Sequence, residues 1–277
     1  MPDSGNPSQG AMDAATPVIF TIVDGLATIT LNRPQHLNGL NSTMARQLRD
    51  AALEVRRRTD VRVLLLQGAG ARFCAGVDLG WLLPEEPGCD QRMRDTLDGL
   101  GSFVQTVREL PAIVVAAVQG AAAGGGFALM CAADLVLASD DVRLSTAYTR
   151  IGGTPDCGLS YLLPRLVGER KAMELLLLSD PLDAGTALHL GLVNQVAPAA
   201  QFPAVVDALV RRLLQGPGQA LARTKRLVTQ ALDQTFAGQL ESELQGMLNA
   251  QACGEMLEGV RAFRQKRPAV YQPPGDH

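Results

Sequence analysis

Three consecutive glycines, Gly124 to Gly126, close a Gly/Ala-rich turn over 120–126 that follows an apolar run over 113–118. Because β-branched residues dominate this run and Pro111 precedes it, we expect a strand buried on both faces. Glycine lacks a Cβ atom, so the turn can take unusual backbone angles and let a ligand come close. The apolar residues 127–132 predict a short helix whose free N–H groups point back at the turn. This pattern is typical of a site for negative charge, with a tight packing turn as the alternative.

A second glycine-containing turn lies upstream of the first. The apolar run over 61–67 predicts another buried strand, which ends in the turn Gly68-x-Gly70. The next residues, ARFCAGVDL over 71–79, predict a turn that runs into a short helix. A dinucleotide-binding loop would place a third glycine where Phe73 stands, so the sequence disfavours a fold of that kind. Two such turns in one chain favour a ligand site over a packing turn.

Other residues add few candidates for chemistry. The five cysteines show no CxxC pair, so we expect reduced thiols that pack in the interior rather than a disulfide or zinc framework. The three histidines, His36, His189 and His277, lack the spacing of metal ligands, so no metal site is expected. Asp156 follows a proline just before a helical pattern begins, and this position alone favours a helix N-cap.

Composition argues against several classes of function. A net charge of −3 without a dense basic run disfavours nucleic acid as a partner, and only 4% of residues are aromatic. The sequence has no run of about 18 apolar residues and no basic start before an apolar segment, which disfavours a membrane span and a secretion signal. We therefore expect a cytoplasmic protein.

The apolar patterns divide the chain into three parts. Residues 1–16 are rich in Pro, Ser, Gly and Asn and predict a disordered tail. Residues 17–200 alternate strand-like runs with turns and helical stripes, which predicts an α/β body. Within it, Pro164 predicts a break in the helix that begins at Leu159. Residues 201–277 show helical stripes only and have little core of their own, so we expect them to pack across a subunit interface.

Five stretches resemble the enoyl-CoA hydratase/isomerase (crotonase) superfamily, in the same order and spacing along nearly the whole chain from about residue 17. They are ITLNRPQHLNGLN (29–41), VLLLQGAGARFCAGVDL (63–79), VVAAVQGAAAGGGFALMCAADLVLA (114–138), IGGTPDCGLSYLLPRLVGERKAMELLLLSD (151–180) and EGVRAFRQKRPAVY (258–271). The resemblance implies an α/β spiral of ββα turns. A C-terminal helical region would follow and build trimers or dimers of trimers.

In this superfamily two backbone N–H groups hold the thioester oxygen of an acyl-CoA substrate. By motif these groups fall on Val77, in CAGVD, and on Gly125, the middle glycine of the triplet. Thioester chemistry of this kind passes through an enolate, and one preorganised donor is typically worth about 3 kcal/mol of the barrier. Because main-chain groups do this work, residue 77 needs no particular side chain.

The resemblance also implies contacts with the CoA moiety of the substrate, and no cofactor or metal beyond it. Motif positions assign these contacts to Gln35, His36, Leu37, Ala75, Asp78 and Leu79, with Phe263 and Lys266 reaching in from a neighbouring subunit. His36 is expected as a wall of the nucleotide groove rather than an acid or base. For Lys266 the alternative is a solvated charge at the end of a basic helix.

The sequence departs from the hydratases of this superfamily at two positions. Hydratases place two glutamates beside a water molecule, and here these positions hold Ala128 and Tyr148. Adding water across a double bond needs one group to activate the water and one to protonate carbon, so hydration is hard to build here. We expect Tyr148 to pack in the interior, to orient the substrate or to donate a proton.

Asp156 matches the acid of isomerases that resemble ring-1,2-epoxyphenylacetyl-CoA isomerase and dienoyl-CoA isomerase. One carboxylate suffices to shift a double bond, since it can take a proton from one carbon and return it to another. The first hypothesis is therefore an isomerase that uses Asp156. One alternative is a hydratase, or a hydrolase- or dehalogenase-like enzyme in which Asp156 works on water or as a nucleophile. The other is a non-catalytic acyl-CoA-binding protein. Residues 80–90, predicted as a loop or lid, would shape the acyl pocket.

Overall fold

The computed structural model describes residues 16–80 and 87–271. The predicted tail, apart from Thr16, lies outside the described residues, and so does most of the predicted loop over 80–90. Among the described residues, no helix combines the length and the hydropathy that crossing a membrane requires.

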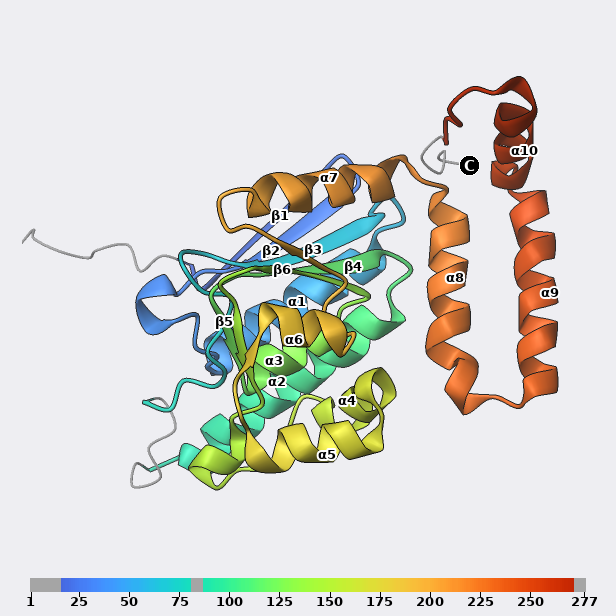
Figure 1. The fold of residues 1–277 in the computed structure, drawn as a ribbon. Helices are drawn as coiled ribbons and strands as arrows, with labels where there is room; N and C mark the ends of the chain where they lie inside the picture. Colours follow the sequence, from blue (N-terminus) through green and yellow to red (C-terminus); the bar gives the residue numbers. More distant parts are fainter. Residues whose placement is uncertain (1–15, 81–86, 272–277) are drawn as a thin grey trace, which may run out of the picture.

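A six-stranded sheet lies at the centre of the molecule (Figure 1). Its strands, in spatial order, are β1 (Val18–Val23), β2 (Leu26–Leu31), β3 (Val63–Gly68), β4 (Ile113–Val118), β6 (Leu135–Ser139) and β9 (Gln195–Ala197). The first two strands form an antiparallel hairpin, and all other neighbours are parallel. Every residue of β4 is buried, which confirms the strand predicted there.

A second, smaller sheet holds three short strands. They are β5 (Ala121–Ala123), β7 (Arg143–Ser145) and β8 (Leu182–Asp183). β5 lies inside the predicted turn over 120–126, which is therefore not a turn throughout. It is extended because it pairs with β7 on one side and with Cys74 on the other. The chain thus runs from β4 to β5 and into α3 (Gly125–Cys131), one unit of the predicted spiral of ββα turns.

Helices cover both faces of the larger sheet (Figure 1). Leu64 faces the core formed with α1 (Ser42–Arg57) and α2 (Cys89–Glu109). Its neighbour Leu65 points the other way, against α7 (Phe202–Gln215). α7 belongs by sequence to the region predicted as 201–277, yet it packs on the sheet and completes the core.

Three more helices follow the glycine-rich centre. They are α4 (Leu159–Val167), α5 (Glu169–Leu178) and α6 (Ala184–His189). The predicted break at Pro164 is wrong, because α4 continues through this residue. Proline costs a helix one backbone hydrogen bond, but the buried Leu159 and Leu163 hold α4 against the core.

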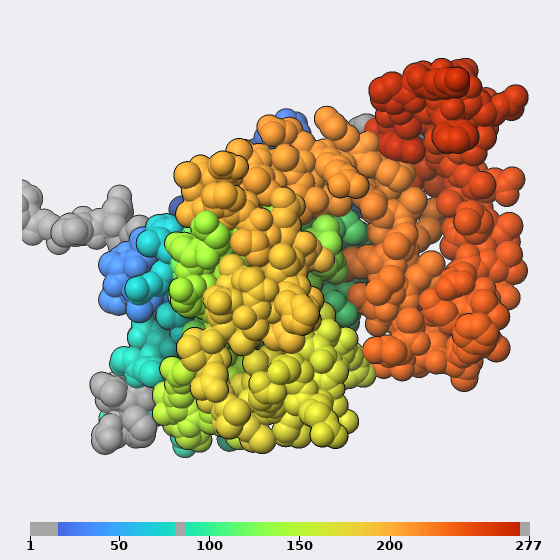
Figure 2. Space-filling model, in the orientation of Figure 1, coloured from blue at the N-terminus to red at the C-terminus, as the bar shows by residue number. Residues whose placement is uncertain are grey.

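The last helices leave the core and form what we call the C-terminal arm. They are α8 (Gly218–Gln230), the short 3₁₀ helix η3 (Ala231–Asp233), α9 (Phe236–Ala252) and α10 (Glu255–Gln265). Figures 1 and 2 show the arm beside the core. No residue of α9 is buried, and Phe236 and Phe263 are 80% and 85% exposed. The predicted packing of this region across a subunit interface stays a prediction.

One residue of α8, Lys225, joins the arm to the core. Its Nζ atom lies 2.7 Å from Oδ2 of Asp134. It also donates hydrogen bonds to the carbonyl oxygens of Val107 and Ala112, both at 3.0 Å. Burial lowers the pKa of Lys225, and the charge of Asp134 opposes this shift. Lys225 is the one buried residue of α8, so a buried ion pair fixes the base of the arm.

Candidate active site

The two glycine-containing turns meet beside the ends of β3 and β4. Cys74, from the first turn, forms an isolated β-bridge with Ala122 in β5. Its N–H donates to Ala121 O at 3.0 Å, and its carbonyl accepts from Ala123 N–H at 3.0 Å. The predicted short helix within 71–79 is therefore wrong, because extended pairing takes up the backbone groups that a helix would use.

Val77 follows in the same extended segment and pairs with Leu40. Leu40 N–H donates to Gly76 O, and Asp78 N–H donates to Leu40 O, both at 2.8 Å. These two bonds flank Val77, and the N–H of a bridge residue that is flanked in this way points to the opposite side. The Val77 N–H therefore points away from Leu40.

Glycine is required where the two turns touch. Gly76 has φ +93°, and a Cβ atom there would lie 2.8 Å from a backbone oxygen of β5. A Cβ atom on Gly126 would overlap the carbonyl oxygen of Cys74. Gly125 consequently comes close to Val77, since a Cβ atom on Gly125 would lie 3.9 Å from Val77 Cγ2.

Gly125 is the first residue of α3, so its N–H has no acceptor within the helix. In the described part of the chain, neither Gly125 N–H nor Val77 N–H donates a hydrogen bond. Buried backbone donors such as that of Gly125 are normally paired. Two neighbouring free donors beside a helix N-terminus suit an oxyanion. The geometry thus agrees with the pair assigned by resemblance, whose catalytic role stays a prediction.

The residues predicted to bind CoA form two neighbouring surface segments. Leu37 follows the 3₁₀ helix η1 (Pro34–His36), and its carbonyl accepts a hydrogen bond from Ala75 N–H at 3.0 Å. The exposed members of the predicted set on these segments are Gln35, His36, Leu37, Ala75 and Leu79. Asp78 is half-buried and forms an ion pair with Arg33 at 2.9 Å.

Asn38 ties these two segments together, and the sequence reasoning missed it. Its side chain is fully buried and donates to the carbonyl oxygens of Ala69, Arg72 and Phe73 at 2.8–3.1 Å. Its Oδ1 accepts from Arg33 N–H at 2.9 Å. A positive φ of 54° fits asparagine better than most residues. The Asn-Gly pair in HLNG is a turn signal that pointed to this bend.

Asp156 and Tyr148 lie in contact. The phenol of Tyr148 donates a hydrogen bond to Asp156 Oδ1 at 2.6 Å. The N-cap of α4 is Gly158, and no side chain caps this helix. The N-cap role that position alone favoured for Asp156 is therefore wrong, because Cys157 and Gly158 both take positive φ and separate the carboxylate from the helix start.

The surroundings keep the neighbours of Asp156 protonated. Burial raises the pKa of Tyr148, and the negative charge of Asp156 raises it further. Burial and the same carboxylate also raise the pKa of the Cys157 thiol. Tyr148 is therefore a hydrogen-bond donor at neutral pH.

Strand β7, which precedes Tyr148, links the Tyr148–Asp156 pair to the glycine turn. Gly124 N–H donates to Ser145 O at 3.1 Å. Three residues later, Tyr148 opens the 3₁₀ helix η2 (Tyr148–Ile151). Ala128, at the other position where hydratases have glutamate, is fully buried in α3. Of the two hydratase glutamate positions, neither carries a carboxylate.

The structure does not bring Phe263 and Lys266 to the other predicted CoA contacts. Both belong to the end of α10, on the far side of the arm from η1 (Figure 1). A contribution from a neighbouring subunit stays a prediction for these two residues.

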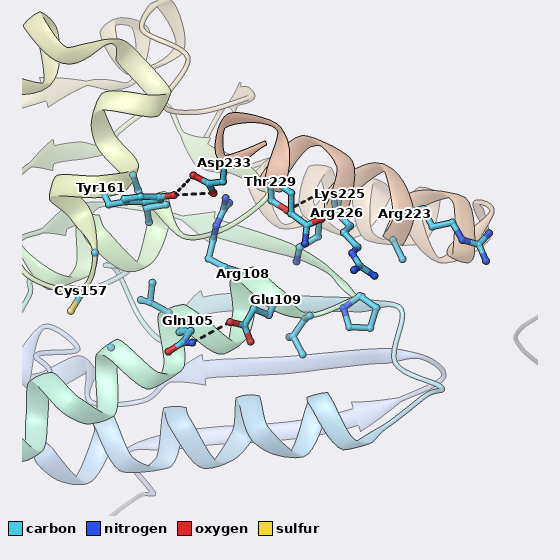
Figure 3. Close-up of a pocket in the computed structure, with 18 of the residues that line it drawn as sticks. Gln105, Arg108, Glu109, Cys157, Tyr161, Arg223, Lys225, Arg226, Thr229 and Asp233 are labelled. Carbon is cyan, nitrogen blue, oxygen red and sulfur yellow. Dashed lines mark hydrogen bonds between the residues drawn. The ribbon is translucent and has the colours of Figure 1, made fainter. Parts of the chain in front are cut away.

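A cavity of about 910 Å³ lies between α2, α4 and α8 (Figure 3). Cys157, Tyr161, Arg108 and Asp233 line it, but none of the predicted site residues does. Cys157 at its edge is the neighbour of Asp156, so the cavity borders the candidate site from outside. No three His, Cys, Asp or Glu side chains of the described residues gather as a metal ion would require.

Comparison with known proteins places the chain in a family. A family model described as enoyl-CoA hydratase/isomerase matches residues 21–274. A probable enoyl-CoA hydratase of Rhodobacter capsulatus is 38% identical over 90% of this chain and 95% of its own length. The 1,2-epoxyphenylacetyl-CoA isomerase of Escherichia coli is 34% identical over 90% of this chain and 96% of its own.

A solved structure extends the likeness to three dimensions. A Thermobifida fusca protein assigned as an enoyl-CoA hydratase and crystallised in complex with CoA has a TM-score of 0.79 and 30% identity, covering 86% of this chain and 94% of its own. The family model, over residues 21–274, includes both glycine turns and the C-terminal helices through α10. The chain belongs to the enoyl-CoA hydratase/isomerase family and is an acyl-CoA enzyme of this family.

Proposed function

We propose that this enzyme is an isomerase that shifts a double bond in an acyl-CoA by proton transfer. The observation that carries the proposal is the make-up of the site in the described part of the chain: Asp156 accompanies the free N–H groups of Val77 and Gly125, while the other carboxylate there, Asp78, is paired with Arg33. The positions from which a second carboxylate would activate water hold Ala128 and Tyr148, and neither can act as a base at neutral pH.

In this mechanism Asp156 takes a proton from one carbon of the acyl chain. The C–H electron pair moves into the chain, and the thioester carbonyl becomes an enolate oxygen that the Val77 and Gly125 N–H groups stabilise. The protonated Asp156 then returns the proton to another carbon, and the carbonyl re-forms. The double bond has moved, the enzyme is unchanged, and no group beyond the substrate's CoA moiety is needed.

The relatives support two versions of this chemistry. The E. coli relative is named as an isomerase, and the R. capsulatus relative as a probable hydratase. A hydratase, with Asp156 acting on water, is therefore the second candidate. Neither of these two relatives is named as a hydrolase or a dehalogenase. The named relatives are enzymes, which counts against a non-catalytic acyl-CoA-binding protein.

We also propose that the arm assembles the enzyme into a trimer or a dimer of trimers. The exposed apolar side chains of α9 and α10 would be covered by a second copy. The same contact would carry Phe263 and Lys266 towards a neighbour's CoA segment.

The test is a paired assay of the wild type and Asp156→Asn. A 3-enoyl-CoA reports conversion to the 2-enoyl form, and a 2-enoyl-CoA reports hydration. We expect the variant to lose isomerisation by about a thousand-fold, since general acid–base groups contribute about 10²–10⁴-fold. Asp233→Asn is the matched control, because Asp233 also accepts hydrogen bonds from a tyrosine, Tyr161, but outside the site. Hydration that survives the loss of Asp156 would overturn the proposal.

A further inference from the structure

We infer that Tyr148 is a positioning residue: it holds the Asp156 carboxylate in one orientation, while a cluster of hydroxyl groups around Ser179 holds Tyr148. The inference gives Tyr148 neither a substrate contact nor a proton to transfer. Its kinetic part rests on the proposed function, whereas its structural part does not.

The contact between Tyr148 and Asp156 is short and part-buried. A distance of 2.6 Å is typical of a hydroxyl that donates to an ionised carboxylate, and such bonds are stronger than those between neutral groups. Tyr148 is 6% exposed, so water competes little for its phenol. Because the bond engages Oδ1, rotation of the carboxylate is restricted and Oδ2 is presented in a defined direction.

Ser179 holds the segment that carries Tyr148. Thr146 Oγ1 lies 3.1 Å and Thr149 Oγ1 lies 2.8 Å from Ser179 Oγ. Ser145 Oγ donates to the carbonyl oxygen of Ser179 at 3.0 Å. The three hydroxyl residues thus flank Tyr148 on both sides and converge on one residue.

The position of Ser179 explains why this cluster is rigid. Ser179 is fully buried and ends α5 with φ +54°. The last carbonyl groups of a helix lack partners within it. Here Leu175 O accepts from the Ser179 N–H at 3.1 Å and also from Thr146 Oγ1 at 2.6 Å, and Leu177 O accepts from Thr149 Oγ1 at 3.1 Å. The segment before and within η2 therefore completes the end of α5, which fixes the backbone of Tyr148.

The kinetic test compares Tyr148→Phe with Tyr161→Phe. Both variants remove one phenol that donates to an aspartate, but Tyr161 lies outside the site. We expect Tyr148→Phe to lower kcat on a 3-enoyl-CoA by about ten- to a hundred-fold with KM within about two-fold, because the base is present but poorly aimed. Tyr161→Phe should match the wild type. A raised KM at unchanged kcat would overturn the inference in favour of a substrate contact, and no change in either would favour packing alone.

A second layer of the test uses Ser179→Ala, with the exposed Ser160→Ala as control. Ser179→Ala should lower kcat by about three- to ten-fold, and the double variant with Tyr148→Phe should be no worse than Tyr148→Phe alone, since both act through one carboxylate. Independent, multiplying losses would contradict the chain of contacts from Ser179 to Asp156.

A spectroscopic measurement keeps the structural part testable even if no isomerase activity is found. Ultraviolet resonance Raman spectra report, through the tyrosine Fermi doublet, whether a phenol donates a strong hydrogen bond. The difference between wild type and Tyr148→Phe isolates Tyr148 among three tyrosines. We expect a strong donor in the wild type and a weaker one in Asp156→Ala. An unchanged Tyr148 signal in Asp156→Ala would show that the bond to Asp156 does not exist in solution.

Discussion

The candidate site and the C-terminal arm are attached to the protein in different ways. At the site, two turns touch through backbone atoms, with Gly76 and Gly126 in positions that admit no side chain. The arm has large apolar side chains in solvent and one buried residue in α8, Lys225, that fixes its base. Both turns of the candidate site therefore come from one chain, whereas the arm, among the described residues, leaves large apolar side chains exposed.

The largest effect on stability and turnover is expected from Gly126→Ala, which disrupts the contact between the two glycine-containing turns. The new methyl group would overlap the backbone of Cys74 and push the Gly125 and Val77 N–H groups out of place. We expect about 3 kcal/mol of lost stability and at least about a hundred-fold lower turnover, measured by denaturant unfolding and the isomerase assay.

Gly101→Ala is the matched control for this change. Gly101 lies in α2, and a Cβ atom there meets nothing within 4 Å. Alanine is favoured over glycine in a helix by about 0.5–1 kcal/mol, so this variant should be as stable as the wild type or more so. Equal behaviour of the two variants would mean that the contact between the turns has no special role.

A smaller loss of stability is expected from Lys225→Met, which removes the ion pair between the arm and the core. The change leaves Asp134 without its cation and removes the donor of the Val107 and Ala112 carbonyls. Breaking a buried pair costs about 3–5 kcal/mol. Because Asp134 still accepts from Val114 N–H, we expect about 2 kcal/mol in the unfolding free energy.

Hydrogen exchange can locate the loss of stability that Lys225→Met causes. In Lys225→Met, the rate of amide hydrogen exchange should increase more in α8 than in α3, because the Lys225–Asp134 ion pair lies outside the candidate site. Lys171→Met, in an exposed pair with Glu174, should change stability by less than about 1 kcal/mol. Faster exchange in α3 than in α8 would contradict the division between site and arm.

The smallest effect concerns the end of the arm and depends on pH. Arg267 holds the Glu258 carboxylate through two hydrogen bonds and lowers its pKa from 4.5 to about 2. A lowered folded pKa means that this contribution is present above pH 4.5 and is lost as the pH falls towards 2. The hydroxyl of Tyr271 lies near Gly259. NMR signals of Tyr271 should therefore report the release of residues 267–271 from α10 between pH 4.5 and about 2. Glu258→Gln should lack the step, and a step that persists in it would belong to another group.

Local patterns predicted the elements of the core well. The apolar runs identified β3 and β4, and the glycine triplet identified the start of α3, because burial on both faces and a missing Cβ atom leave direct marks on the sequence. The prediction failed where distant residues decide the outcome. Ala121–Ala123 is a strand only because Cys74 and β7 pair with it, and Pro164 stays helical only because α4 is packed against the core.

The candidate site shows the same division. Resemblance assigned the N–H donors, and the backbone geometry agrees with them. Position alone favoured an N-cap for Asp156, but the hydrogen bond from Tyr148 and the positive φ of Cys157 exclude it. Asn38 and Ser179 were missed because each acts on residues about 30 or more positions away in the chain.

The bridge between Cys74 and Ala122 has a consequence for folding. Val77 and Gly125 belong to segments far apart in sequence, and their N–H groups become neighbours only when both turns have docked. A fragment that contains only one of the two turns therefore cannot place the Val77 and Gly125 N–H groups side by side. Long-range contacts of this kind form late and are lost together, so turnover in a refolding experiment should return with the last cooperative phase rather than with the first appearance of helix.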